Sequence, residues 1–117
     1  MSGLRSHMAG LAAEEAVARH YDLAGRAICA RRWRGLSGEI DLIARDGETV
    51  VFVEVKQSRT HDEAAWHLTE RQFRRIYDAA AEFLSGEPAG QATDVRFDLA
   101  LVDGQGRIDV RENLWLN

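Results

Sequence analysis

Two apolar runs separated by Asp46-Gly47 constrain the fold more strongly than any other feature of the sequence. Residues 39–44 and 49–55 are rich in β-branched and other apolar side chains. An Asp-Gly pair between two such runs is a strong local signal for a β-hairpin. The chain is therefore expected to build its core around a β-sheet that contains this hairpin.

Closing the hairpin at Asp46-Gly47 sets the register of its two strands, with Asp41 opposite Phe52. Side chains along a strand alternate between the two faces of a sheet. One face is expected to carry Glu39, Asp41, Val50, Phe52, Glu54 and Lys56. The other face is wholly apolar and is expected to be core, with Ile40, Leu42, Ala44, Val51, Val53 and Val55.

The rest of the chain predicts helices and further strands. The alanine-rich residues 9–24 have apolar positions at helical spacing, and residues 64–84 predict one long amphipathic helix. Residues 27–33 predict an edge strand, residues 95–101 a half-buried strand, and residues 107–110 a short final strand. The order α-β-β-β-α-β-β predicts an α/β fold in which helices pack on a mixed β-sheet.

The charged face of the hairpin has the composition of a metal site. Asp41 and Glu54 are expected to be diagonal neighbours with Cα atoms roughly 7–8 Å apart, and carboxylates this close repel each other unless a cation lies between them. Their oxygen atoms favour Mg²⁺ or Mn²⁺. Lys56, the only lysine among fifteen basic residues, reaches the same space. Metal ligands and a cation that positions water are the parts that phosphodiester hydrolysis requires.

A solvated sheet face with a cross-strand salt bridge is the alternative interpretation of these charges. A lone Glu-x-Lys pattern on a strand favours that alternative. Residues 50–55 are nearly all apolar, however, which indicates a central, buried strand. Buried charges that are neither paired nor metal-bound cost much free energy, so a functional site is the preferred hypothesis.

With these residues in place, the chain resembles the YraN-like family of small bacterial proteins. That family belongs to the PD-(D/E)-x-K, or restriction-endonuclease-like, superfamily. The resemblance extends from about residue 10 to residue 115, and residues 38–44 and 51–56 carry it. Weaker matches are Gly10 to Glu14, Arg71-Gln72 and Arg96-Phe97-Asp98. The resemblance implies a restriction-endonuclease-like core in a single nuclease-like domain over residues 10–117, after an uncertain lead at residues 1–9.

The resemblance also implies roles for individual residues. Asp41 and Glu54 would bind the metal, and Lys56 would assist the attacking water. Glu14 resembles an extra acidic residue that archaeal Holliday-junction resolvases place near the metal, although a solvated helix face is an equal alternative. Two residues are expected to support the metal ligands from close by, Glu39 and Gln72, and an ordinary helix surface is the alternative for Gln72.

Arginines are the candidates for contacting a nucleic acid, although the net charge of −4 counts against a dedicated binder. Clustered positive charge marks Arg31, Arg32, Arg34 and Arg71 as the candidate residues. A solubilising edge strand is the alternative interpretation for the first three. The sequence lacks a signal peptide and a membrane-length apolar run, which predicts a cytoplasmic protein without membrane contact.

Three hypotheses follow for the function. The first is a Mg²⁺- or Mn²⁺-dependent endonuclease that hydrolyses DNA phosphodiester bonds, with branched or junction DNA as the substrate suggested by the resolvase resemblance. The second is a non-catalytic module that keeps the fold and binds nucleic acid or a nuclease partner. The third is a purely structural interaction protein. Whether the chain acts as a homodimer is left open by the sequence.

Overall fold

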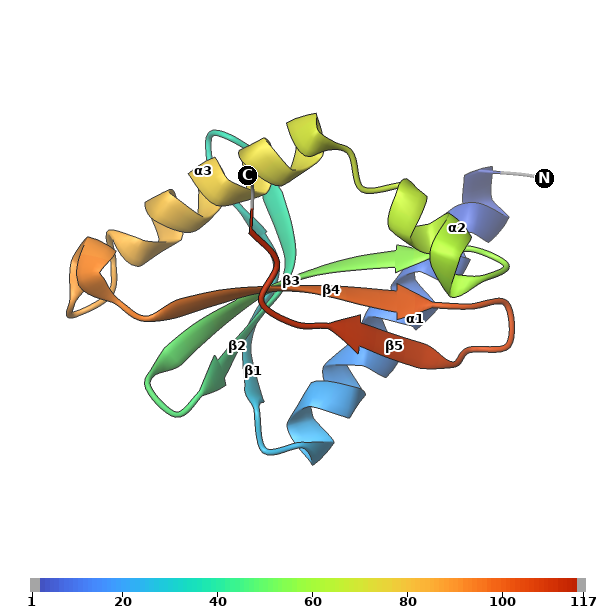
Figure 1. The fold of residues 1–117 in the computed structure, drawn as a ribbon, viewed down its shortest axis with the longest axis horizontal. Helices are drawn as coiled ribbons and strands as arrows, with labels where there is room; N and C mark the ends of the chain where they lie inside the picture. Colours follow the sequence, from blue (N-terminus) through green and yellow to red (C-terminus); the bar gives the residue numbers. More distant parts are fainter. Residues whose placement is uncertain (1–2, 116–117) are drawn as a thin grey trace.

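A computed structural model describes residues 3–115 as a five-stranded sheet with helices on both faces (Figure 1). The helices are α1 (Gly3–Leu23), α2 (His61–Trp66) and α3 (Glu70–Leu84), followed by the short 3-10 helix η1 (Gly90–Ala92). The strands are β1 (Ala27–Arg34), β2 (Glu39–Asp46), β3 (Thr49–Gln57), β4 (Val95–Val102) and β5 (Ile108–Arg111). The predicted α/β class and the predicted order of helices and strands are confirmed.

The strands are ordered β1-β2-β3-β4-β5, so the sheet is mixed. β1, β2 and β3 form an antiparallel meander, β4 runs parallel to β3, and β5 returns antiparallel to β4. A parallel pair needs a crossover connection, and α2 and α3 provide it between β3 and β4. β1 lies at one edge of the sheet, as predicted for residues 27–33.

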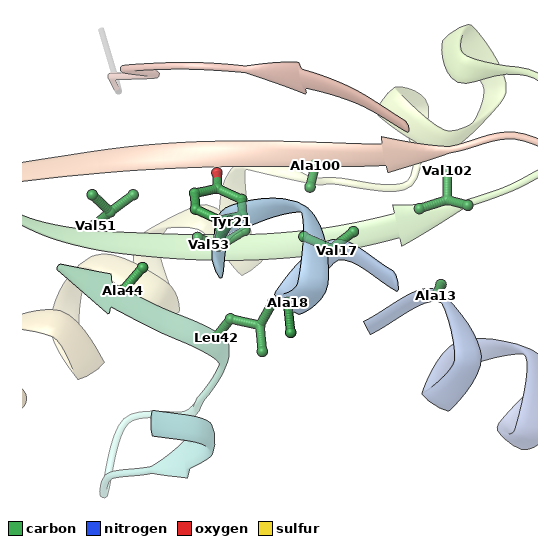
Figure 2. Close-up of a cluster of buried hydrophobic side chains, with 10 residues drawn as sticks. All are labelled: Ala13, Val17, Ala18, Tyr21, Leu42, Ala44, Val51, Val53, Ala100 and Val102. Atoms are coloured by element: carbon green, nitrogen blue, oxygen red, sulfur yellow. The ribbon is translucent and has the colours of Figure 1, made fainter. Parts of the chain in front are cut away.

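The face of the sheet under α1 forms one core cluster (Figure 2). Apolar side chains of α1 contact the β2, β3 and β4 side chains of this face. The buried members are Ala13, Val17, Ala18, Tyr21, Leu42, Ala44, Val51, Val53, Ala100 and Val102. The Tyr21 hydroxyl points toward β4 and donates to Asp98 Oδ2 over 2.6 Å. The helix is thereby fixed on the sheet by a polar contact as well as by packing.

The face under α3 forms a second, aromatic-rich core. Its buried members are Ile40, Ile43, Val50, Phe52, Ile76, Ala79, Ala80, Leu84 and Phe97. Phe52 stacks on Phe97 with ring centroids 5.3 Å apart. Since helices cover both faces, the strands in the middle of the sheet are buried on both sides.

This double burial corrects the prediction of a half-buried strand over residues 95–101. β4 is buried from Phe97 to Val102 on both of its faces. The polar residue within this stretch, Asp98, is 3% exposed and accepts hydrogen bonds instead of facing water. Alternation of polar and apolar residues therefore indicated the wrong exposure, because Asp98 has buried partners.

The prediction of one helix over residues 64–84 is also corrected. Two helices, α2 and α3, are separated by a corner at residues 67–69. Thr60 caps α2 by accepting from the backbone N–H of Glu63, and Thr69 caps α3 by accepting from that of Gln72. An N-cap residue has extended backbone angles, so Thr69 begins a new helix where an uninterrupted helix was expected.

The hairpin between β2 and β3 closes one residue later than predicted. Asp46 pairs with Thr49, which leaves Gly47 and Glu48 as the turn residues. Gly47 has φ +62°, and a two-residue hairpin turn with glycine first requires a positive φ at that position. The pairing therefore differs from the predicted one by two residues, and Ile43, not Asp41, lies opposite Phe52.

The predicted facing of Ile40 is wrong. Ile40 packs under α3 with Val50 and Phe52, whereas Leu42 packs under α1. Residues two apart on a regular strand share a face, so β2 is irregular at Asp41. The neighbouring strand departs from regular geometry at the same level, where Arg32 has φ 46°. This irregularity positions the side chain of Asp41.

The first helix begins earlier than expected, at Gly3 instead of residue 9. It therefore includes most of the segment interpreted as an uncertain lead. Within residues 3–115, no helix has the combination of length and hydropathy that crossing a membrane demands.

Candidate metal centre

Asp41 lies where the main-chain pairing of β2 and β3 stops. That pairing ends at Leu42–Val53, and beyond it Asp41 Oδ2 accepts a hydrogen bond of 2.8 Å from the backbone N–H of Val55. A side chain thus satisfies an N–H that a regular ladder would satisfy with a carbonyl. Burial raises the pKa of Asp41, although the hydrogen bond from Val55 opposes that change.

Glu54 is the buried carboxylate at the centre of the cluster, with 7% of its surface exposed. Its Oε2 atom accepts from Gln72 Nε2 over 3.0 Å and lies 3.2 Å from Lys56 Nζ. Burial, followed by the nearby charge of Asp41, raises the pKa of Glu54 to about 8. The carboxylates of Asp41 and Glu54 therefore lie in one region, as predicted from the hairpin. The negative charge of Asp41 disfavours the ionised form of Glu54.

Gln72 reaches Glu54 because of its place on α3. Thr69 is the N-cap, so Gln72 is the third helical residue, and Thr-x-x-Gln is a capping-box pattern. In a capping box the Gln side chain returns to the N-cap backbone, but here it donates to the carboxylate of Glu54 on β3. The structure thus places Gln72 in the site and not on an ordinary helix surface.

Glu14 and Glu39 lie around this pair. The pKa of Glu14 is raised by burial and then by the charge of Asp41, so Glu14 lies near Asp41. Its Oε1 atom lies 3.6 Å from Arg32 Nε, and Glu39 Oε2 lies 2.8 Å from Arg34 Nη2. Both carboxylates are therefore already balanced by arginines of β1.

The four arginines expected to contact nucleic acid fall into two groups. Arg31, like Arg32 and Arg34, is engaged by a carboxylate: its Nη1 atom lies 2.6 Å from Glu15 Oε2. Arg71 on α3 is exposed, and no carboxylate in the described part of the chain lies within 4.0 Å of it. The β1 arginines therefore balance acidic residues, whereas the charge of Arg71 is not balanced by a carboxylate within the described part of the chain.

The donor set suits a hard divalent cation that keeps part of its hydration shell. Among residues 3–115, no three His, Cys, Asp or Glu side chains converge as a ready-made metal cage. Mg²⁺ rarely needs one, because it commonly takes one or two carboxylates and fills its other positions with water and phosphate oxygens. Asp41 and Glu54 are two such carboxylates; burial is the main cause that raises the pKa of each, and a cation bound between them would favour their ionised forms.

Sequence reasoning missed two sets of contacts, one within the site and one outside it. One is the backbone N–H of Val55, which depends on the irregularity of β2 and has no signal in the residue types. The other concerns Arg96-Phe97-Asp98, which lies outside the site: Asp98 accepts from Tyr21, Arg96 and the backbone N–H of Asn113. Through these hydrogen bonds, Asp98 links both α1 and the segment at Asn113 to β4.

Comparison with known proteins gives a consistent result. Residues 13–102 match the model of a family described as "Uncharacterised protein family UPF0102". A UPF0102 protein of Cereibacter sphaeroides is 64% identical over 113 residues, 97% of this chain and 97% of the relative. One from Ruegeria pomeroyi is 59% identical over 95% of this chain and 90% of the relative, and one from Dinoroseobacter shibae is 45% identical over 96% and 84%. The chain therefore belongs to the UPF0102 family.

Proposed function

We propose that the protein is a metal-dependent endonuclease of the PD-(D/E)-x-K superfamily that hydrolyses DNA phosphodiester bonds. One observation carries the proposal: two carboxylates, Asp41 and Glu54, converge in a largely buried region with the ammonium group of Lys56 3.2 Å from Glu54. A cluster of this kind is costly for a purely structural role, because buried carboxylates repel each other and lose hydration.

The chain's own residues would divide the work in the following way. The Val55 N–H holds Asp41, and the Gln72 amide holds Glu54, so both carboxylates are oriented before any ligand arrives. Together they would hold Mg²⁺ or Mn²⁺. The bound ion supplies charge stabilisation at the phosphate and lowers the pKa of water. Lys56 carries a positive charge at the same place and can orient the water or stabilise a phosphoryl oxygen.

A non-catalytic module that binds nucleic acid or a nuclease partner is the second candidate function. The net charge of −4 and the ion pairs that engage the β1 arginines favour the form of this candidate that binds a nuclease partner, since they limit the positive charge available for phosphates. A module of this kind would bind its protein or nucleic-acid partner without any requirement for a divalent ion. The two candidates therefore differ in whether Asp41 and Lys56 are needed for a chemical step.

The test is cleavage of end-labelled single-stranded, flap and four-way-junction DNA in Mg²⁺ or Mn²⁺. Wild type, Asp41→Asn and Lys56→Ala are purified in parallel, with EDTA reactions as blanks. The proposal expects cleavage by wild type alone and, if branched DNA is the substrate, faster cleavage of the flap or junction. Equal activity in all three proteins would indicate a contaminating nuclease and reject the proposal.

A further inference from the structure

α3 carries two exposed arginines whose charges are not balanced by nearby carboxylates. Arg71 and Arg75 are four residues apart, so their Cβ atoms lie about 5–6 Å apart on one side of the helix. Within the described part of the chain, neither has an acidic oxygen within 4.0 Å. By contrast, Arg74 on the same helix pairs with Glu70 over 3.2 Å. The pair Arg71 and Arg75 is called the α3 stripe below.

The α3 stripe lies on the helix whose first turn contacts Glu54. At the far end of α3, Glu82 accepts from the backbone N–H groups of Leu36 and Ser37 over 2.7 and 3.0 Å. About two turns earlier, a Cβ built on Gly38 would lie 3.5 Å from Arg75 Cβ. The helix therefore follows the chain from the β1–β2 loop toward β2, and its first turn ends at the site, where Gln72 contacts Glu54.

An exposed indole precedes α3 in the chain, at the end of α2. Trp66 ends α2 and is 86% exposed, which is unusual for so large an apolar ring. Only residues 67–70 separate it from Arg71, and Leu68 in this corner packs into the core. The corner is therefore anchored, and Trp66 is held within a few residues of the α3 stripe with its ring in solvent.

The α3 stripe and Trp66 together form a narrow surface with two positive charges, unpaired within the described residues, and one exposed indole. A duplex binder normally neutralises many phosphates over a broad basic face, and the β1 arginines of this chain are engaged by Glu14, Glu15 and Glu39. Binding of single strands combines a track of positive charge with aromatic rings on which unpaired bases stack. The α3 stripe and Trp66 have that composition.

We propose that the site takes single-stranded DNA, whose backbone follows Arg75 and Arg71 toward the carboxylates and one of whose bases stacks on Trp66. This inference rests on the proposed function, since it names the substrate class of the same site. It extends to the unpaired arm of a flap, which presents the same chemistry. Paired DNA cannot offer a base face to Trp66 without being unstacked.

The test measures binding in EDTA, where no cleavage occurs, by fluorescence anisotropy of a labelled 20-mer of thymidine and of a 20-base-pair duplex. The variants are Arg71→Ala/Arg75→Ala, with Arg74→Ala as the matched control, and Trp66→Ala, with Trp66→Phe as the conservative control. The double variant is expected to weaken single-strand binding at least about tenfold and to reduce the salt slope by about 1.4, the value for two lost phosphate contacts. Arg74→Ala should stay within about twofold of wild type.

Trp66→Ala is expected to weaken single-strand binding at least about fivefold, and Trp66→Phe to retain most of it, because any aromatic ring can stack. Equal affinity for duplex and single strand would overturn the inference, as would equal losses in Arg74→Ala and the double variant. The proposed nuclease activity is tested separately. If single-strand binding shows the expected pattern but no cleavage occurs, the nuclease proposal is rejected and the proposed binding surface is retained. Cleavage of single strands with unchanged KM in both α3-stripe and Trp66 variants rejects this inference alone.

Discussion

The side-chain amide of Gln72 donates to the carboxylate of Glu54 across 3.0 Å and joins the first turn of α3 to the buried strand β3. The two residues are 18 positions apart and belong to different layers of the fold. Gln72 gives up the usual capping-box contact with its own helix to make this bond. The contact therefore orients a carboxylate that would otherwise have fewer donors in a buried place.

Replacing Gln72 with Leu should destabilise the protein. The substitution leaves Glu54 Oε2 without one donor, and an unsatisfied buried polar group costs about 1–3 kcal/mol. Urea unfolding at about pH 8, where Glu54 ionises, measures the free energy of unfolding. Gln57→Leu, at an exposed position at the end of β3, is the control and should change that free energy by less than about 0.5 kcal/mol. Equal effects of the two substitutions would remove the role assigned to Gln72.

The metal-free protein should lose stability as the pH rises from about 4.5 to about 8. Burial and Asp41 raise the pKa of Glu54 to about 8 from the ordinary 4.5. In that window the folded protein holds a proton that the unfolded chain has released, so the free energy of unfolding falls with increasing pH. Glu54→Gln removes the titrating group and should flatten this dependence.

Urea midpoints measured in EDTA across this window test the prediction, with the exposed Glu15→Gln as the control. Glu15→Gln should keep the wild-type slope, since Glu15 lies outside the buried pair and contacts Arg31. Parallel profiles for wild type and Glu54→Gln would show that Glu54 does not control the dependence.

Mn²⁺ should raise the melting temperature of the wild type and leave that of Asp41→Asn unchanged. A ligand that binds only the folded state stabilises it by RT ln(1 + [L]/Kd), which is about 2.7 kcal/mol at a hundredfold excess over Kd. For a domain of this size that corresponds to a shift of several degrees. The shift should grow from pH 6 to pH 8, because the ion competes with the proton on Glu54. Identical shifts in wild type and Asp41→Asn would place the bound ion elsewhere.

The alternation of side chains along the hairpin was sufficient to place Glu54 and Lys56 together, whereas the position of Asp41 beside them depends on the irregularity of β2. The alternation tolerated the error in the turn, because a shift of two residues keeps each side chain on its face. The facing of Ile40 could not be predicted, since it depends on an irregularity shared with Arg32 of the neighbouring strand. The helix break was missed for a different reason: helical periodicity resumes after the corner with only Thr69 to mark it.

The long-range hydrogen-bond and ion-pair partners could not be predicted from the sequence, for a physical reason. The donor to Glu54 and the donor to Asp41 come from elements that meet only after the sheet and α3 have packed. The same holds for the engagement of the β1 arginines, which looked free in the sequence and face Glu14, Glu15 and Glu39 in the fold. Charge clustering along a chain therefore overestimates the charge available to a ligand.

Arg96→Leu should destabilise the protein strongly without altering the metal site. Arg96 Nε donates to the buried Asp98 over 2.9 Å, and Arg96 Nη1 lies 3.3 Å from Asp46 at the hairpin tip. Removing one partner of a buried pair costs about 3–5 kcal/mol, because the other charge stays uncompensated. Arg107→Leu, an exposed arginine, is the control. At a temperature where the variant remains folded, its melting temperature should still rise with Mn²⁺.

Lys56→Met should separate metal binding from chemistry. The substitution keeps an unbranched side chain of similar length and removes the ammonium group 3.2 Å from Glu54. Asp41 and Glu54 remain, so the Mn²⁺-induced rise in melting temperature should persist, while DNA cleavage should fall at least about a hundredfold if Lys56 orients the water. Loss of both the thermal shift and cleavage would make Lys56 a structural counter-ion for Glu54. Cleavage at the wild-type rate would exclude Lys56 from the reaction.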